Sequence, residues 1–262
     1  MNRYFRLIRI FTGATIAAQL EYRANFVGAV LASLGEVGIA LLGISVLFMQ
    51  PGTSTVGGWT FREALLVTGF FMLTEGFISV FVQPNMSRIA EAVRTGSMDF
   101  TLLKPIDAQF NVSTRNLNVL RLPDILIGLG LIAYAAAGLS ISPGGVLVAA
   151  LLYLSALVIV YCIWLALSTT AFWFVKTQNA AELFNGIFGA ARFPVTAFPV
   201  PVRFLLTFIV PIAFITTVPA QAVTGQLTPA LALASPLVAA ALFAVTRWFW
   251  LKAVGSYTSA SS

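Results

Sequence analysis

The stretch that decides the fold is PNMSRIAEAVRTGSMDFTLLKPIDAQFNVSTRNLNVLR, residues 84–121. It is the only long polar stretch away from the N-terminus, and apolar segments flank it on both sides. It also holds five of the fifteen basic residues. A membrane protein that keeps one large polar loop on one side usually uses it to contact a soluble component. The function therefore depends largely on what docks at this loop.

The rest of the composition belongs to a protein whose solvent is a lipid bilayer. Of the 262 residues, 59% are hydrophobic and 9% are charged, and the mean hydropathy is +0.93. A soluble domain carries about 25% charged residues. Because one span needs about 20 mostly apolar residues, the length allows roughly six or seven spans and no separate soluble domain. The sequence predicts a single all-α transmembrane domain over residues 1–262.

Several kinds of chemistry are excluded by the residues that are missing. The chain has no histidine, and Cys162 is its single cysteine, which excludes disulfides, His/Cys metal sites and histidine-based catalysis. No P-loop motif occurs, so we expect no nucleotide site and no cofactor on this chain. The net charge of +6 reflects basic residues on one membrane face, and we expect no nucleic-acid partner.

Residues 1–23 favour an interfacial helix over a cleaved signal peptide. Their apolar core is weak, and Glu21 and Arg23 follow it directly. At 100° per residue, Arg3, Arg6 and Arg9 share one helical face, opposite an apolar face. Such a helix lies in the headgroup layer of a membrane.

Five spans are read directly from the hydropathy pattern, over residues 25–50, 62–83, 122–140, 146–175 and 230–251. Pro143-Gly144-Gly145 is expected to make the turn between the third and the fourth. Residues 178–225 hold two further apolar pieces, 180–198 and 204–223, which prolines interrupt. Both chain ends are basic, so the positive-inside rule places them on one side and makes one piece re-entrant. The count of basic residues slightly favours the first piece, while Arg62, Arg192 and Arg203 would face outside if the second is re-entrant.

Residues 86–95 have the pattern of an amphipathic helix. Ile89 and Val93 share one side, Arg88, Glu91 and Arg94 are polar positions, and Gly96 can end the helix in a left-handed conformation. Two interpretations are open from the residues alone. The helix either joins two hairpins at the membrane surface or docks onto a partner.

Four segments together resemble the ABC-2 type permeases, in the subgroup of short chains that have no ATPase domain. They are VRTGSMDFTLLKPID (93–107), RFPVTAFPVPVRFLLTFIVPIAFITTVPAQAV (192–223), LEYRANF (20–26) and SYTSASS (256–262). The resemblance covers essentially the whole chain. It implies six spans, with residues 180–198 crossing the membrane and residues 199–225 forming external re-entrant helices.

The resemblance also implies partners. The loop 84–121 would be cytoplasmic, and its coupling helix would sit in a groove of a separate ABC ATPase, which holds the ATP and Mg²⁺. The implied coupling residues are Arg88, Glu91, Arg94, Gly96, Ser97, Asp99, Lys104 and Pro105. The N-terminal helix, with Arg3, Arg6, Arg9, Glu21 and Arg23, would flank this contact. The chain would pair with itself or with a paralogous permease in a bacterial cytoplasmic (inner) membrane, with both termini cytoplasmic. The exported substrate is not readable.

Two carboxylates fall inside predicted spans. Glu36 and Glu75 each lie about 21 Å from the external ends of their helices, so an antiparallel hairpin would place them at one depth. Such residues usually face a cavity or a partner, which indicates the transport path or a dimer seam. The alternative is that both are protonated or hydrogen-bonded to neighbouring helices. They also support a competing hypothesis, a proton-coupled secondary transporter.

Glycines in two predicted spans suit close helix approach. They are Gly28, Gly35, Gly38 and Gly43 in the first span, and Gly186 and Gly189 in the fifth.

Overall fold

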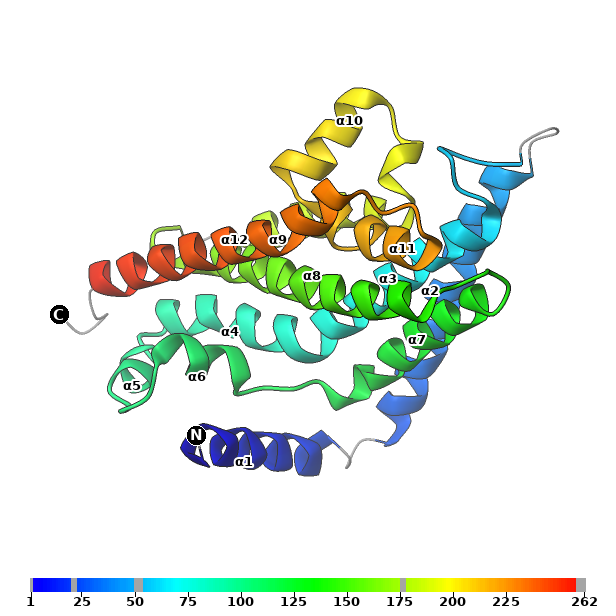
Figure 1. Cartoon of the computed structure of the whole chain (residues 1–262). Coiled ribbons are helices and arrows are strands. Elements are labelled where there is room, and N and C mark those ends of the chain that lie inside the picture. Colours follow the sequence, from blue (N-terminus) through cyan, green and yellow to red (C-terminus); the bar gives the residue numbers. More distant parts are fainter. Residues whose placement is uncertain (1, 20–22, 50–53, 175–177, 258–262) are drawn as a thin grey trace.

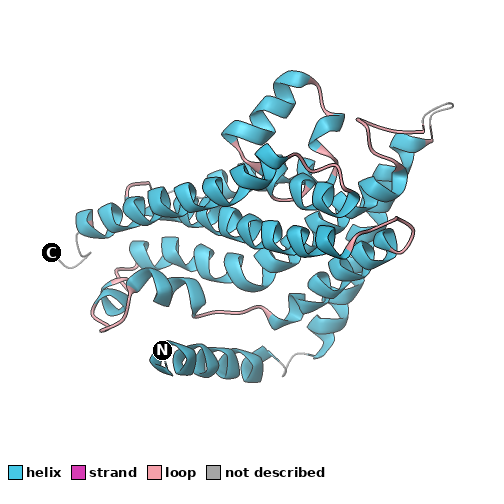
Figure 2. Ribbon diagram, viewed as in Figure 1, coloured by secondary structure: helices cyan, strands magenta, loops and turns pink. Residues whose placement is uncertain are grey.

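The computed structural model describes residues 2–19, 23–49, 54–174 and 178–257. In these ranges the chain is all helical and forms no strand, apart from an isolated bridge between Val56 and Trp59. Figure 2 shows several long helices that lie side by side, with loops and turns between them. Five helical stretches of the described residues are long and apolar enough to cross a membrane: Phe26–Phe48, Phe61–Arg94, Val119–Ala136, Pro143–Phe172 and Pro229–Ser256. The predicted all-α membrane class is therefore confirmed.

Among the long helices, α3 (Phe61–Phe77) is the most buried, and it packs along α7 (Leu122–Ala136). The long helices α8 (Pro143–Thr169) and α12 (Pro229–Ser256) lie side by side (Figure 1). The short α11 (Thr217–Thr224) fills the space against α8 and α3. By contrast, α2 (Arg23–Phe48) lies at the edge and is exposed along most of its length.

Two glycines allow α3 and α7 to approach closely. A Cβ atom added to Gly128 of α7 would lie 2.5 Å from the backbone nitrogen of Leu73, and one on Gly76 of α3 would lie 2.7 Å from that of Ile125. Small residues of this kind let membrane helices pack backbone to backbone. The α2 glycines that the sequence pointed to, Gly28, Gly35 and Gly38, have open space beside them. That prediction was wrong for contacts within the chain.

The second predicted span does not end at residue 83. It continues through a π-helical turn (Ile78–Val82) into α4 (Gln83–Arg94), as one helix of 34 residues. Pro84 lies in the first turn of α4, where a missing N–H is tolerated. Met86 and Ile89 of α4 are buried. The predicted coupling helix is therefore a packed extension of the span rather than a separate surface helix.

The connection between the third and fourth predicted spans also differs. Pro143-Gly144-Gly145 is not the turn but the first turn of α8. The Ser142 hydroxyl accepts a hydrogen bond from the Gly145 N–H at 3.0 Å and caps the helix. A proline after a serine cap is a favoured helix start, so the reversal of the chain falls in the preceding residues.

The predicted span over residues 180–198 is not confirmed. Its helix α9 (Gln178–Phe188) runs into a 3₁₀ turn (Gly189–Arg192), and the following Phe193 is extended at φ −109° and ψ 149°. The residue before a proline avoids the helical conformation, so Pro194 ends this helix early.

Residues 199–225 form two arms on either side of Pro211. The exposed arm is α10 (Val200–Phe204) with a π-helical turn (Leu205–Ile209), and the buried arm is a 3₁₀ turn (Ile212–Phe214) with α11. A re-entrant membrane segment needs such an arrangement, in which protein covers irregular backbone. That this segment is re-entrant from outside stays a prediction.

The remaining helices are α1 (Asn2–Gln19), α5 (Asp99–Leu102) and α6 (Ala108–Thr114). Short 3₁₀ turns lie at Val119–Arg121, Thr170–Phe172 and Val195–Ala197. The beginning of α1 and the end of α12 lie at the same end as α5, and α10 lies far from α5 (Figure 1).

Replacing Gly128 by valine should disrupt the α3–α7 contact. The new side chain meets the α3 backbone, and overpacking of this kind costs about 1–3 kcal/mol. We expect a clearly lower unfolding temperature in detergent, measured by fluorescence-detected size-exclusion chromatography. Gly130→Val is the matched control, because Gly130 is on the same helix with open space beside it. Equal unfolding temperatures for the two variants would contradict the close approach.

Candidate functional site

The polar loop folds into a compact tip, residues 95–104, at the end of α4. Gly96 has φ +72°, a left-handed conformation that reverses the chain after α4. Met98 is fully buried, and its N–H donates to the Ala92 carbonyl at 3.0 Å. These two residues fix the tip against the helix that it follows.

The tip presents apolar side chains outward. Phe100 is 73% exposed and Leu103 is 81% exposed, among the highest values for large apolar residues in the described chain. Aromatic and aliphatic side chains displayed on a fixed turn are what a partner's pocket can bind. The sequence reasoning concentrated on charged residues here and missed these two as contacts.

The predicted coupling residues separate into two groups. Around the tip, Glu91 and Arg94 form an exposed ion pair of 2.7 Å, and the Thr95 and Ser97 hydroxyls lie 2.9 Å apart. Lys104 and Pro105 are exposed, and Asp99 is half-buried. Arg88 lies two turns further back along α4 and faces a groove shared with α1. An exposed ion pair contributes at most about 1 kcal/mol, so Glu91 and Arg94 are available to a partner.

Hydrogen bonds join the base of α4 to the end of the loop. Because Pro84 has no N–H, the Val80 carbonyl lacks its helical partner and instead accepts from the Asn118 N–H at 3.0 Å. The buried Asn85 amide donates to the Asn116 carbonyl at 2.7 Å and accepts from the Asn116 N–H at 2.8 Å. The returning loop thus supplies the hydrogen bond that the long helix lacks at Pro84.

The N-terminal helix is attached to the same returning loop. The Gln19 side chain donates to the Leu117 carbonyl and accepts from the Val119 N–H, both at 2.7 Å. Arg88 and Arg115 line the groove between α1 and α4. The expected proximity of the N-terminal helix to the coupling loop is therefore present. Arg6 and Arg9 are exposed on α1, whereas Glu21 and the side chains of Arg3 and Arg23 lie outside the described residues.

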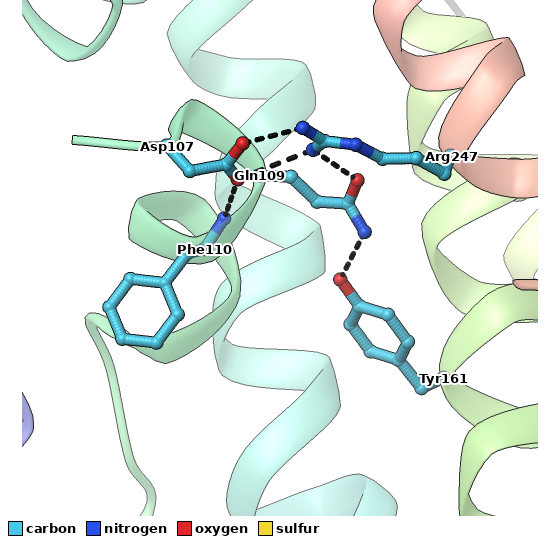
Figure 3. Close-up of polar contacts among 5 residues, drawn as sticks. All are labelled: Asp107, Gln109, Phe110, Tyr161 and Arg247. Carbon is cyan, nitrogen blue, oxygen red and sulfur yellow. Dashed lines mark hydrogen bonds and ion pairs between the residues drawn. The ribbon is translucent and has the colours of Figure 1, made fainter. Parts of the chain in front are cut away.

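A second polar connection joins the loop to the spans (Figure 3). The Arg247 guanidinium of α12 donates to the Asp107 carboxylate at 2.6 Å and to the Gln109 side-chain oxygen at 2.9 Å. Gln109 in turn donates to the Tyr161 hydroxyl of α8 at 2.9 Å. Asp107 also caps α6 by accepting from the Phe110 N–H at 2.9 Å. We call these four side chains, Asp107, Gln109, Tyr161 and Arg247, the loop–span network.

The charge state of Asp107 follows from this network. Burial alone would raise its pKa, but the hydrogen bonds from Arg247 and from backbone N–H groups hold the pKa below its usual value. Asp107 is therefore ionised at neutral pH. Burial and the Asp99 carboxylate raise the pKa of Tyr257, which follows the end of α12.

A polar cavity of about 410 Å³ lies between α2, α3, α7 and the end of α9. Glu36 and Glu75, the two carboxylates predicted at one depth, both line it. Arg121, Asp124 and Arg192 complete the charged lining. Ser33 of α2 donates to Asp124, which forms an ion pair of 3.5 Å with Arg121.

Arg192 lies deeper than the sequence indicated. Its guanidinium is 5.4 Å from the centre of the Phe71 ring, and its Nε donates to the Gly189 carbonyl at 2.9 Å. Phe71 is about 15 Å along α3 from its first residue. The early end of α9 thus turns Arg192 into the bundle, where it lines the cavity. The sequence analysis also missed Asp124. An acidic residue within an apolar segment drew attention to Glu36, and Asp124 has the same signal.

These features define a multi-pass, all-helical membrane protein with a polar loop at one end and a charged cavity between its helices. A sequence model of the family described as "ABC-2 family transporter protein" matches residues 34–261. The chain belongs to this family, whose members are membrane subunits of transporters. No curated protein matches the sequence.

Asp107→Asn should loosen the loop–span network while keeping the cap of α6, since asparagine caps helices as well as aspartate. The lost charge removes about 1 kcal/mol from a partly exposed pair. We expect roughly fivefold faster hydrogen–deuterium exchange in α6, measured by mass spectrometry.

Arg247→Gln should give the same increase, and the double variant should add little to either single variant. Glu91→Gln is the control, because it breaks only the exposed ion pair with Arg94. Additive effects of the two single variants would show that Asp107 and Arg247 act independently.

Proposed function

We propose that the chain is the membrane-spanning subunit of an ATP-driven ABC exporter. It pairs with itself or with a paralogous permease, and separate ATPase subunits bind its tip. The observation that carries this proposal is the tip, where Phe100 and Leu103 project from a turn fixed by Gly96 and Met98. Family membership supports the association with ABC ATPases.

The arrangement around the tip supports a mechanical role. Closure of two ATPase subunits around ATP would move the tip, and α4 would carry this displacement into α3, since the two form one helix. The loop–span network would carry it to α12 and α8. Rigid-body transmission through packed helices is an established form of coupling.

Pairing with a second permease is supported by the exposed face of α2. Gly28, Gly35 and Gly38 have no neighbour within the chain, and Leu31, Leu42 and Val46 are each more than 60% exposed. A second permease packed there would use the small residues as membrane helices commonly do. Both termini would be cytoplasmic in a bacterial inner membrane, on the side of the tip.

A proton-coupled secondary transporter is the second candidate. The observation in its favour is that Glu36 and Glu75 line one cavity. Family membership favours the ATP-driven alternative. A mild-detergent pull-down from the native membrane, with mass spectrometry of the bound proteins, separates the two. Recovery of a stoichiometric P-loop ATPase supports the exporter, and a single-chain oligomer without one supports the proton-coupled transporter.

Leu103→Asp should reduce recovery of the ATPase about tenfold or more, because it places a charge where an apolar anchor enters a pocket. Phe100→Asp should act in the same way. Val200→Asp is the matched control, since Val200 is 74% exposed on α10, far from the tip. If all three variants retain the ATPase equally, the tip is not the docking surface.

A further inference from the structure

The charges that line the polar cavity do not balance within the chain. Asp124 is paired with Arg121 and receives a hydrogen bond from Ser33. Among the described residues, Glu36 and Glu75 have no hydrogen bond and no ion pair, although both face the same space. Arg192 is the remaining cation of the lining, so two carboxyl groups share one basic side chain.

An unpaired carboxylate at membrane depth is costly, because the surrounding lipid and apolar side chains solvate it poorly. Arg192 offsets only part of this cost, since it donates to the Gly189 carbonyl and lies over the Phe71 ring. A positively charged ligand between Glu36 and Glu75 would supply the missing countercharge.

The remaining walls of the cavity are apolar. Val37, Ala40, Phe71, Met72 and Ile127 line it beside the carboxylates. Ile39 lines it too and is 65% exposed on α2, so the cavity opens at the exposed side of this helix. A volume of about 410 Å³ lies within the roughly 300–1,000 Å³ of small-molecule sites. Apolar walls with few carboxylate oxygens suit an organic cation better than Ca²⁺, which takes six to eight oxygen ligands.

We propose that this cavity binds a lipophilic organic cation, held by Glu36 and Glu75 against the apolar wall of α3. The identification of this cation as an exported substrate rests on the proposed transport function. The binding itself does not, and it is measured on the chain without an ATPase.

The test uses two probes of the same shape and opposite charge, tetraphenylphosphonium and tetraphenylborate. The full chain is placed in nanodiscs of zwitterionic lipid, and affinity is obtained from the rise in unfolding temperature with probe concentration. We expect the cation to stabilise the protein and the anion not to. Glu36→Gln and Glu75→Gln should each weaken cation binding about tenfold or more, the usual cost of losing a charged partner.

Two further variants complete the test. Arg192→Gln should strengthen cation binding, because it removes the one positive charge that competes with the ligand. Glu182→Gln should leave binding unchanged, since Glu182 is exposed on α9 and does not line the cavity. If the glutamine variants of Glu36 and Glu75 do not fold, Arg192→Gln decides the test. Stronger cation binding by this variant supports the proposal, and unchanged or weaker binding contradicts it.

Equal stabilisation by both probes, a preference for the anion, or unchanged affinity in the glutamine variants would overturn the proposal. A chain that recovers its ATPase but binds no cation refutes this inference alone. A chain that binds the cation but recovers no ATPase in the pull-down from its native membrane instead refutes the ATP-driven mechanism alone.

Discussion

The structure depends on one backbone constraint, the missing N–H of Pro84. In a helix that runs unbroken from Phe61 to Arg94, this proline leaves the Val80 carbonyl without its normal partner. The chain resolves the defect by bringing Asn118 to that carbonyl and by pairing Asn85 with Asn116. The end of the polar loop is therefore held against the base of the helix that begins it. Without these hydrogen bonds, the start and the end of the loop would not be held together at its base.

Closing the loop at its base gives the tip two separate connections to the membrane-spanning helices. One runs along α4 into α3, which Gly76 and Gly128 hold tightly against α7. The other runs from Asp107 through Arg247 to α12 and through Gln109 to Tyr161 of α8. A load at the tip therefore reaches α3, α8 and α12 together, as the proposed coupling mechanism requires. The apolar residues Phe100 and Leu103 extend beyond both connections, so a partner can bind them without disturbing either.

Sequence reasoning predicted the class and most long helices because hydropathy and Pro/Gly punctuation are local signals. It singled out Glu36 and Glu75, which line one cavity, since a carboxylate in an apolar span is conspicuous. It missed the charged contacts that only the tertiary fold creates. Arg192 reaches the cavity only because Pro194 ends α9 early, and Asp107 meets Arg247 across 140 residues of chain. The glycine prediction selected positions that do not pack against another helix of the chain. Composition marks every glycine in a span, and only the packing distinguishes Gly128 from Gly35.

The polar cavity and the tip share one element, and this connects binding with coupling. Glu75 lies in α3, about 28 Å along the same helix from Arg94 at the base of the tip. Glu36 lies in a different helix, α2, which contacts α3 and α7 and donates from Ser33 to Asp124 of α7. A displacement of α3 and α4 that α2 does not follow would change the separation between Glu75 and Glu36. Since the proposed cation is held by the two carboxylates jointly, such a displacement would weaken its binding. In the proposed exporter, ATP-driven movement of the tip would thus release the ligand by separating the charges that hold it.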